Sequence, residues 1–398
     1  MLALEGLRIL DLSRYLPGSF ASLCFADFGA EVIMIEDPKQ GEPGRKNAPY
    51  IKGISARHLL LQRNKKSMSL DIRSNEGKEI FSKLLATADV VIENFKPGYL
   101  TRIGLDYTAA SKINPRIIYC SLSGFGQYGE RNQIAGHDIN YIALAGVMGL
   151  SGSADTPPPL PGVQLADMTG SLMGQIGILL ALSAREKTGR GQQVDVAFFD
   201  AAIGLLPLIA APYFAEEKSY QPGEHIYTGS QAWYNVYPTK DNRYIAIGAL
   251  ETKFWHQLCD HLQVSEFKDL QWKADQQPEM KQKLQEIFRS KTQQQWQVEL
   301  EPLNICCSAV RTTLEVFSDP AVIEREMVVT TLHPTVGEIK QIGFPIKLSD
   351  TPAQIRKSAP NLGESNNFIL TELGYSASEI EILCQKNVLS MEFSEGIP

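Results

Sequence analysis

The feature that most constrains this chain is the alternation of short apolar runs with helical spacing over its first third. Residues 6–12 (GLRILDL) and 31–36 (EVIMIE) are typical of buried strands, and residues 18–28 between them have helical spacing. The alternation continues with a helix at 75–87 and strand-like segments at 67–71, 89–93 and 116–121. This pattern predicts an α/β fold with an open, mostly parallel sheet covered by helices on both faces.

The first strand-to-helix turn lacks the glycine fingerprint of a dinucleotide-binding domain. Residues 13–18 read SRYLPG, with no GxGxxG, so no nicotinamide or flavin cofactor is expected. Segment 124–129 (GFGQYG) follows a strand, but a turn that needs positive φ angles explains its glycines equally well. The 38 Lys and Arg against 45 Asp and Glu give a net charge of −7, which argues against nucleic acid as a partner.

A long apolar helix is predicted over residues 167–186. Gly170, Gly174 and Gly177 fall on one of its faces, which would let another backbone or a flat ligand approach closely. A strand at 193–197 and a second long helical stretch at 200–214 follow it.

Polar turn residues near Tyr220 mark the start of a second domain with strands at 233–237 and 244–248. We therefore predict a smaller α+β domain beside the large one. The predicted bounds are 1–198 for the large domain, which 318–398 completes, 199–225 for a linker helix and 226–317 for the small domain.

The cysteines and the N-terminus indicate a cytoplasmic protein. The 6 cysteines form no CxxC pair and have no His at metal-ligand spacing, so we expect reduced thiols and no metal site. The N-terminal run contains Glu5 and Asp11 and no basic leader. The most apolar stretch, 201–212, is too short to span a bilayer, so no membrane partner is expected.

Three polar residues stand near predicted helix starts, where a structural or a chemical role can account for each. His137 opens the helix in GHDINY (136–141), and histidine is both a common boundary residue and the commonest general base. Asp167 in LADMTG can cap its helix or act beside an oxyanion that the following helical turn stabilises. Glu251 in GALETKFW is by itself a typical first-turn acid.

Taken together, the motifs resemble those of the class III CoA-transferase (CaiB/BaiF-type) family. The resemblance runs through most of the chain and rests on these segments: LEGLRILDLS, NKKSMSLD, ENFKPG, RIGLDY, SLSGFGQYG, AGHDINY, LADMTG, TGRGQQVDVAFFDA, GALETKFW and SAPNLGES. GHDINY together with the Glu of GALETKFW is similar to the α-methylacyl-CoA racemase branch.

That branch implies a racemase that interconverts (R)- and (S)-2-methylacyl-CoA thioesters by 1,1-proton transfer through an enolate. His137 and Asp167 would then flank the α-carbon, Glu251 would orient His137, and neither metal nor organic cofactor would be needed. The alternative is a CoA-transferase in which Asp167 forms an aspartyl-CoA intermediate, and this chemistry needs neither His137 nor Glu251. A non-catalytic CoA-binding protein is a further alternative.

The resemblance also implies a Rossmann-like CoA-binding domain and an interlocked homodimer, with Glu251 supplied in trans. The pantetheine arm of the acyl-CoA substrate would pass Gly124, Gly126 and Asp138. The remaining residues expected to bind CoA are Arg63, Lys65, Lys66, Asn94, Lys96 and Arg102. Relatives often carry a basic residue where this chain has Asp37, so the resemblance does not extend to contacts between this loop and the adenine end.

Overall fold

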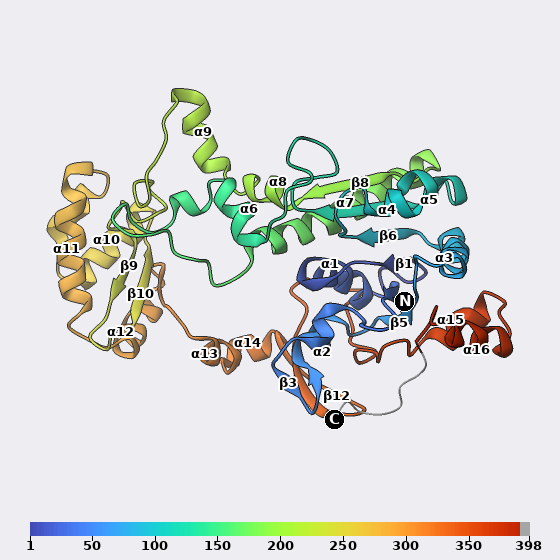
Figure 1. Ribbon diagram of the computed structural model, residues 1–398. Coiled ribbons are helices and arrows are strands. Elements are labelled where there is room, and N and C mark those ends of the chain that lie inside the picture. Colours follow the sequence, from blue (N-terminus) through green and yellow to red (C-terminus); the bar gives the residue numbers. More distant parts are fainter. Residues whose placement is uncertain (391–398) are drawn as a thin grey trace. The chain divides into compact units, whose positions relative to one another are not determined.

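The computed structural model describes residues 1–390, which divide into two compact units (Figure 1). Unit 1 contains residues 1–145, 162–205 and the described residues from Pro320 onward. Unit 2 contains residues 146–161 and 206–319.

Unit 1 is built on a six-stranded sheet in which every neighbouring pair of strands is parallel. Its strands, in spatial order, are β5 (Lys66–Ser69), β2 (Glu31–Glu36), β1 (Arg8–Asp11), β6 (Val90–Glu93), β7 (Ile118–Ser123) and β8 (Gln193–Ala197). The parallel α/β sheet predicted from the sequence is therefore confirmed. Successive strands run outward in one direction from β1 and in the other from β6, so the connections from β1 and β6 diverge at the carboxyl ends of these two strands.

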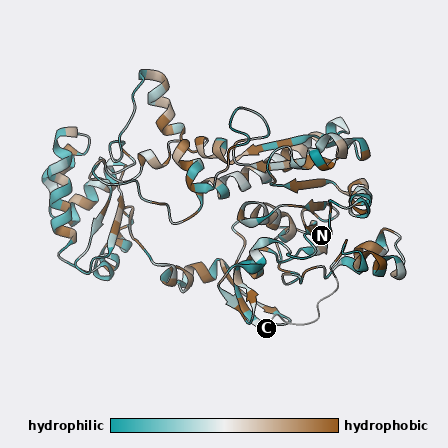
Figure 2. Cartoon of the chain, viewed as in Figure 1, coloured by the Kyte–Doolittle hydropathy of each residue, from teal (hydrophilic) through white to brown (hydrophobic). Residues whose placement is uncertain are grey.

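Apolar strands form the core of unit 1. Ile9 and Leu10 of β1 and Val90, Val91 and Ile92 of β6 are completely buried, as strands covered on both faces must be. Figure 2 shows the hydrophobic colour along β6.

Helices connect the parallel strands and cover the sheet (Figure 1). Those of unit 1 are α1 (Tyr15–Asp27), α2 (Ala56–Leu61), α3 (Asn75–Thr87), α4 (Tyr99–Ile103), α5 (Tyr107–Ile113), α6 (Asp138–Leu144), α7 (Leu165–Thr188), α8 (Phe198–Ile203), α14 (Pro320–Glu324), α15 (Asn366–Glu372) and α16 (Ala377–Gln385). Two short hairpins accompany them, β3 (Tyr50–Ile51) with β4 (Ile54–Ser55) and β12 (Val328–His333) with β13 (Gly337–Ile342).

The glycine face of α7 packs on the sheet. A Cβ atom on Gly174 would lie 2.8 Å from Leu122 of β7, and one on Gly177 would lie 2.6 Å from Val194 of β8. The close approach expected from the sequence is confirmed, but side chains of the protein itself, rather than a ligand, fill this face. By length and composition α7 could cross a membrane, and one of its faces packs on β7 and β8.

The second helical stretch predicted at 200–214 is not one helix. It is divided between α8 and α9 (Pro207–Glu216). Pro207 is the first residue of α9, a position that proline tolerates because its missing N–H would have no helical partner there. The single linker helix predicted over 199–225 is wrong for the same reason.

Unit 2 has an antiparallel three-stranded sheet in the order β11 (Cys307–Ala309), β10 (Tyr244–Gly248) and β9 (Tyr234–Pro238). Its core contains the buried Trp233, Trp255 and Phe288. The longer helices of this unit beside α9 are α10 (Thr252–His261), α11 (Gln277–Phe288) and α12 (Gln293–Leu300), and α13 (Thr313–Phe317) is shorter. The α+β character predicted for the smaller part of the chain agrees with this architecture.

Candidate active site

A cavity of about 1570 Å³ lies in unit 1, where the connections from β1 and β6 diverge. Ligands of open α/β sheets bind at such positions because the loops that follow the two strands leave a crevice between them. Tyr15 follows β1 here, Asn94 follows β6 and Gly124 follows β7, and all three line the cavity. The Asn94 side chain joins two of these loops, since Oδ1 accepts from the Arg14 N–H at 2.8 Å and Nδ2 donates to the Arg14 carbonyl at 2.7 Å.

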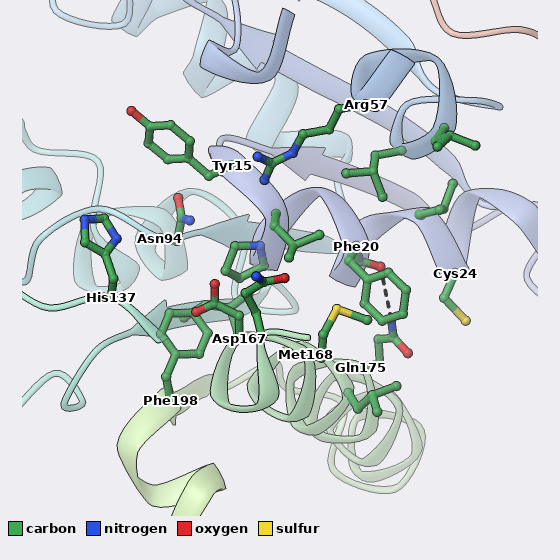
Figure 3. Close-up of a pocket in the computed structure, with 18 of the residues that line it drawn as sticks. Tyr15, Phe20, Cys24, Arg57, Asn94, His137, Asp167, Met168, Gln175 and Phe198 are labelled. Carbon is green, nitrogen blue, oxygen red and sulfur yellow. Dashed lines mark hydrogen bonds between the residues drawn. The ribbon is translucent and has the colours of Figure 1, made fainter. Parts of the chain in front are cut away.

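Asp167 extends into this cavity from the first turn of α7 (Figure 3). Burial raises the pKa of its carboxyl to about 6, the negative charge of Asp138 adds to the rise, and His137 and Arg57 oppose it. The N-cap of α7 is Gln164, so Asp167 lies inside the helix and the capping role considered from the sequence is wrong.

Two N–H groups in the first turn of α7 are already occupied. The Asp167 N–H donates to Asp138 Oδ1 at 3.0 Å, and the Met168 N–H donates to the Gln164 carbonyl at 3.0 Å. These two N–H groups are therefore not free to face an oxyanion, and the oxyanion role of the turn stays a prediction.

His137 lines the same cavity from the N-cap of α6 (Figure 3). Its position is fixed by the backbone, because the His137 N–H donates to Asn140 Oδ1 at 3.0 Å. Just before it, the Gly136 carbonyl accepts from the Tyr141 hydroxyl at 2.6 Å. Within residues 1–390 no hydrogen bond joins the side chains of His137 and Asp167, and both face the space that a substrate could occupy.

Gly124 and Gly136 hold this part of the site close to Tyr141. A Cβ atom on either glycine would lie 2.7 Å from the Tyr141 side chain. Burial raises the pKa of Tyr141 to about 12, so this hydroxyl stays protonated and keeps its bond to Gly136. Gly126 has φ +86° and does not line the cavity, which agrees with the turn role considered for it.

Comparison with known proteins identifies the family of this fold and site. The family model described as CoA-transferase family III matches residues 4–366. The chain belongs to this family. A CAIB/BAIF family protein from Brucella suis has a similar structure, with a TM-score of 0.82, 32% sequence identity and coverage of 94% of this chain and 99% of that chain. The class III CoA-transferase resemblance and the expected fold are thereby confirmed.

Relatives with different activities have almost the same sequence identity to this chain. The succinyl-CoA:glutarate CoA-transferase of Mus musculus is 33% identical, over 96% of this chain and 90% of the relative. The alpha-methylacyl-CoA racemase of Homo sapiens is 32% identical, over 95% of each protein. Members of the family are thus enzymes that act on acyl-CoA, and identity alone does not separate the two reactions.

Glu251 lies in unit 2 of this family III chain, as the N-cap residue of α10. It is exposed, and its backbone carbonyl accepts from the Phe254 N–H at 2.9 Å. No side-chain capping bond is formed, so the carboxylate is not used by the helix that it begins.

The basic segment at residues 63–66 is used mainly for internal contacts. Arg63 lines the cavity, but its guanidinium donates to Asp27 Oδ2 at 2.8 Å and to the Ile342 carbonyl at 2.7 Å. Lys66 is paired with Glu31 and does not line the cavity. A direct contact with CoA, expected for this segment, is therefore not supported by the positions of Lys65 and Lys66.

Lys96 lines the cavity, whereas Arg102 and Asp138 do not. The Arg102 guanidinium lies 5.9 Å from the centre of the Tyr99 ring on α4. Asp138 acts on the site through Asp167, to whose N–H its carboxylate is bonded. Among the residues described, no group of His, Cys, Asp and Glu has the arrangement of a metal site.

Lys65 is completely buried and stabilises unit 1. Its ammonium donates to the Ser19 carbonyl at 2.9 Å, to Ser22 Oγ at 2.7 Å and to Gln62 Oε1 at 2.7 Å, and Asp11 Oδ2 lies 3.8 Å away. Burial lowers the pKa of Lys65 to about 8.

We expect Lys65→Ala to lower the free energy of unfolding by about 3 kcal/mol, because the buried Asp11 carboxylate would lose its positive partner. Urea denaturation measures this change. Lys112→Ala, on the exposed end of α5, is the control and should stay within about 0.5 kcal/mol of the wild type. Equal stability of the two variants would contradict the role given to Lys65.

Sequence reasoning missed several polar residues of the cavity, among them Arg57 and Ser123. Ser123 ends β7, and its buried Oγ has no hydrogen-bond partner among residues 1–390. Arg57 precedes HLLL (58–61), and nothing in the spacing of these residues marks it as part of a site.

Proposed function

We propose that the protein is an α-methylacyl-CoA racemase that interconverts (R)- and (S)-2-methylacyl-CoA thioesters by 1,1-proton transfer. The observation that carries this proposal is the presence of His137 and Asp167 in one cavity, on two different helices and with no bond between their side chains. An imidazole and a carboxylate so arranged can contact an α-carbon from two directions. A transferase needs only the carboxylate.

In the proposed reaction one base breaks the α-C–H bond and takes the proton, and the electron pair passes into the enolate of the thioester. The conjugate acid of the other base then forms a new C–H bond on the opposite face. A carboxyl with a pKa of about 6 suits both directions, since it can accept and return a proton near neutral pH. These steps use only acid–base groups, so we propose no metal or organic cofactor.

CoA transfer is the second candidate, and the names of several relatives support it. Succinyl-CoA--D-citramalate CoA-transferase of Chloroflexus aurantiacus, for example, is 31% identical over 97% of this chain and 98% of the relative. In this reaction Asp167 would attack the thioester carbonyl, release CoA thiolate as a mixed anhydride forms, and then become an aspartyl-CoA thioester. His137 would have no required role.

An assay with one purified epimer of a 2-methylacyl-CoA separates the two candidates. The racemase proposal predicts that chiral chromatography shows both epimers in the absence of any carboxylic acid. If the epimer stays pure and CoA appears on an isotopically labelled acid added as acceptor, the racemase proposal fails and the transferase takes its place.

The pH profile of epimerisation tests the role of Asp167. Because the pKa of Asp167 is about 6, we expect kcat/KM to fall as the pH drops below about 6, where the Asp167 carboxylate is protonated and can no longer accept the α-proton. Asp138→Asn removes a negative charge that raises this pKa, so the acid limb should move to lower pH. Asp269→Asn, an exposed change in unit 2, should leave the limb in place. A limb that stays fixed in Asp138→Asn would contradict the assignment.

We further propose that the enzyme is a homodimer, as the family resemblance implied. The outer face of α7 exposes Met173, Ile176, Leu179 and Leu180, which are 43–66% accessible. Such a run of apolar side chains is typical of a surface covered by another protein chain. In this arrangement Glu251 would come from the partner to orient His137.

We also propose that the protein is cytoplasmic and has no nucleic-acid or membrane partner.

A further inference from the structure

Arg57 places a guanidinium in the wall of the cavity. It lies on α2, and Figure 3 shows its guanidinium directed into the cavity, on the far side from the Asp167 that α7 carries. In the part of the chain that the structure describes, no hydrogen bond or ion pair engages this guanidinium. Its positive charge nevertheless acts on the Asp167 carboxyl.

Within residues 1–390, two other arginines of unit 1 have the carboxylate partner that Arg57 lacks. Arg63 is paired with Asp27 at 2.8 Å, and Arg45 is paired with Glu36 at 2.6 Å. Arg57 instead has apolar neighbours along the cavity wall, including Leu60 and Leu61 of its own helix. A guanidinium in an apolar wall is stabilised by an anion that supplies two acceptor atoms.

The position of the thioester at Asp167 determines which part of the substrate can bring an anion to Arg57. Asp167 acts on the α-carbon or the carbonyl of the thioester, and both are next to the acyl chain. The pantetheine arm is uncharged, and the phosphates of CoA lie beyond its far end, away from the thioester. An anion that reaches Arg57 while the thioester lies at Asp167 therefore belongs to the acyl side, and carboxylate matches the planar guanidinium fork.

We propose that Arg57 determines specificity by binding a carboxylate at the acyl end of the site. This proposal rests on the proposed function and narrows its substrate class. The carboxylate has two sources, the far end of a 2-methyl-dicarboxylyl-CoA thioester or a free carboxylic acid bound beside CoA. Both present the same group to Arg57, and the experiment separates them.

The test compares the binding of two thioesters of nearly equal shape by isothermal titration calorimetry. One is 2-methylglutaryl-CoA, esterified next to its methyl branch, and the other is 2,5-dimethylhexanoyl-CoA, in which an isopropyl group replaces the carboxylate. We expect the wild type to bind the carboxylated thioester roughly 10- to 100-fold more tightly, the range expected for a charge-assisted bidentate pair.

Arg57→Gln should remove this preference and change the affinity for the neutral thioester less than about 2-fold. Arg57→Lys should keep part of the preference, because it retains the charge without the fork. Arg289→Gln, an exposed change on unit 2, is the control and should behave as the wild type.

A second titration adds glutarate to the protein already loaded with CoA. If Arg57→Gln weakens only this binding, the carboxylate comes from a free acid, and Arg57 keeps its assigned role. If the wild type prefers neither carboxylated ligand, or if Arg57→Gln weakens both thioesters equally, the proposal is overturned. Epimerisation of the same thioesters is measured separately, so failure of the racemase proposal is visible even when the binding results support Arg57.

Discussion

Asp167→Asn is expected to abolish both epimerisation and CoA transfer, with a loss of at least about 10³-fold in kcat. The side chain would keep its shape but lose the charge that accepts a proton in one reaction and attacks the thioester in the other. The two activities are measured on the same preparation, by chiral chromatography of the thioester and by transfer of CoA to a labelled acid.

The fold of this variant should be retained, because Asp167 is bonded to Asp138 and Ser171 only through its backbone N–H and carbonyl. Circular dichroism and thermal unfolding check this directly. Asp269→Asn is again the matched control and should keep full activity. A folded Asp167→Asn variant that retains more than a tenth of the epimerisation rate would remove Asp167 from the reaction.

His137→Ala is expected to lower epimerisation by about 10²- to 10⁴-fold, the usual contribution of a positioned general base, and to spare any CoA transfer. Asp167 could still remove and return the α-proton on one face of the substrate. In deuterated water the variant should therefore exchange the α-hydrogen of one epimer without converting it into the other.

The His137→Ala result is informative in either direction. Loss of epimerisation with exchange of a single epimer would assign one face of the substrate to each base. Epimerisation at the wild-type rate in a folded His137→Ala variant would contradict the two-base mechanism. His261→Ala, on the last turn of α10 in unit 2, provides a histidine control.

Much of the parallel sheet could be predicted because local pattern and final burial agree there. The predicted strand at 31–36 and helix at 75–87 coincide with β2 and α3. These strands are buried on both faces, so their apolar runs are unbroken and easily recognised. The hairpin of β12 and β13 was not predicted, since its strands alternate between buried and exposed positions over short lengths.

The candidate site was only partly predictable. His137 and Asp167 were found because each stands in a recognisable motif, and the structure brings both to one cavity. Lys65 stands in an equally clear motif, yet its ammonium is enclosed by Ser19, Ser22 and Gln62. A motif shows that a residue type is required, but whether it serves the ligand or the core depends on contacts between distant segments.

Arg57 illustrates the opposite case. Nothing in the spacing of its neighbours marks it, and its importance appears only when α2 and α7 are seen on opposite sides of the same cavity. We propose that Arg57 pairs with a carboxylate of the ligand. Because this partner is not a residue of the chain, the sequence contains no acidic residue that would point to the pair.

The most direct test of the proposed function is to incubate the wild-type protein with a single epimer of a 2-methylacyl-CoA in deuterated water, with no acceptor acid present. Mass spectrometry and chiral chromatography then follow α-deuterium and epimer ratio together. The racemase account predicts that the opposite epimer appears and carries deuterium at the α-carbon. An unchanged epimer without deuterium, under conditions in which the same protein transfers CoA to an added acid, would contradict it.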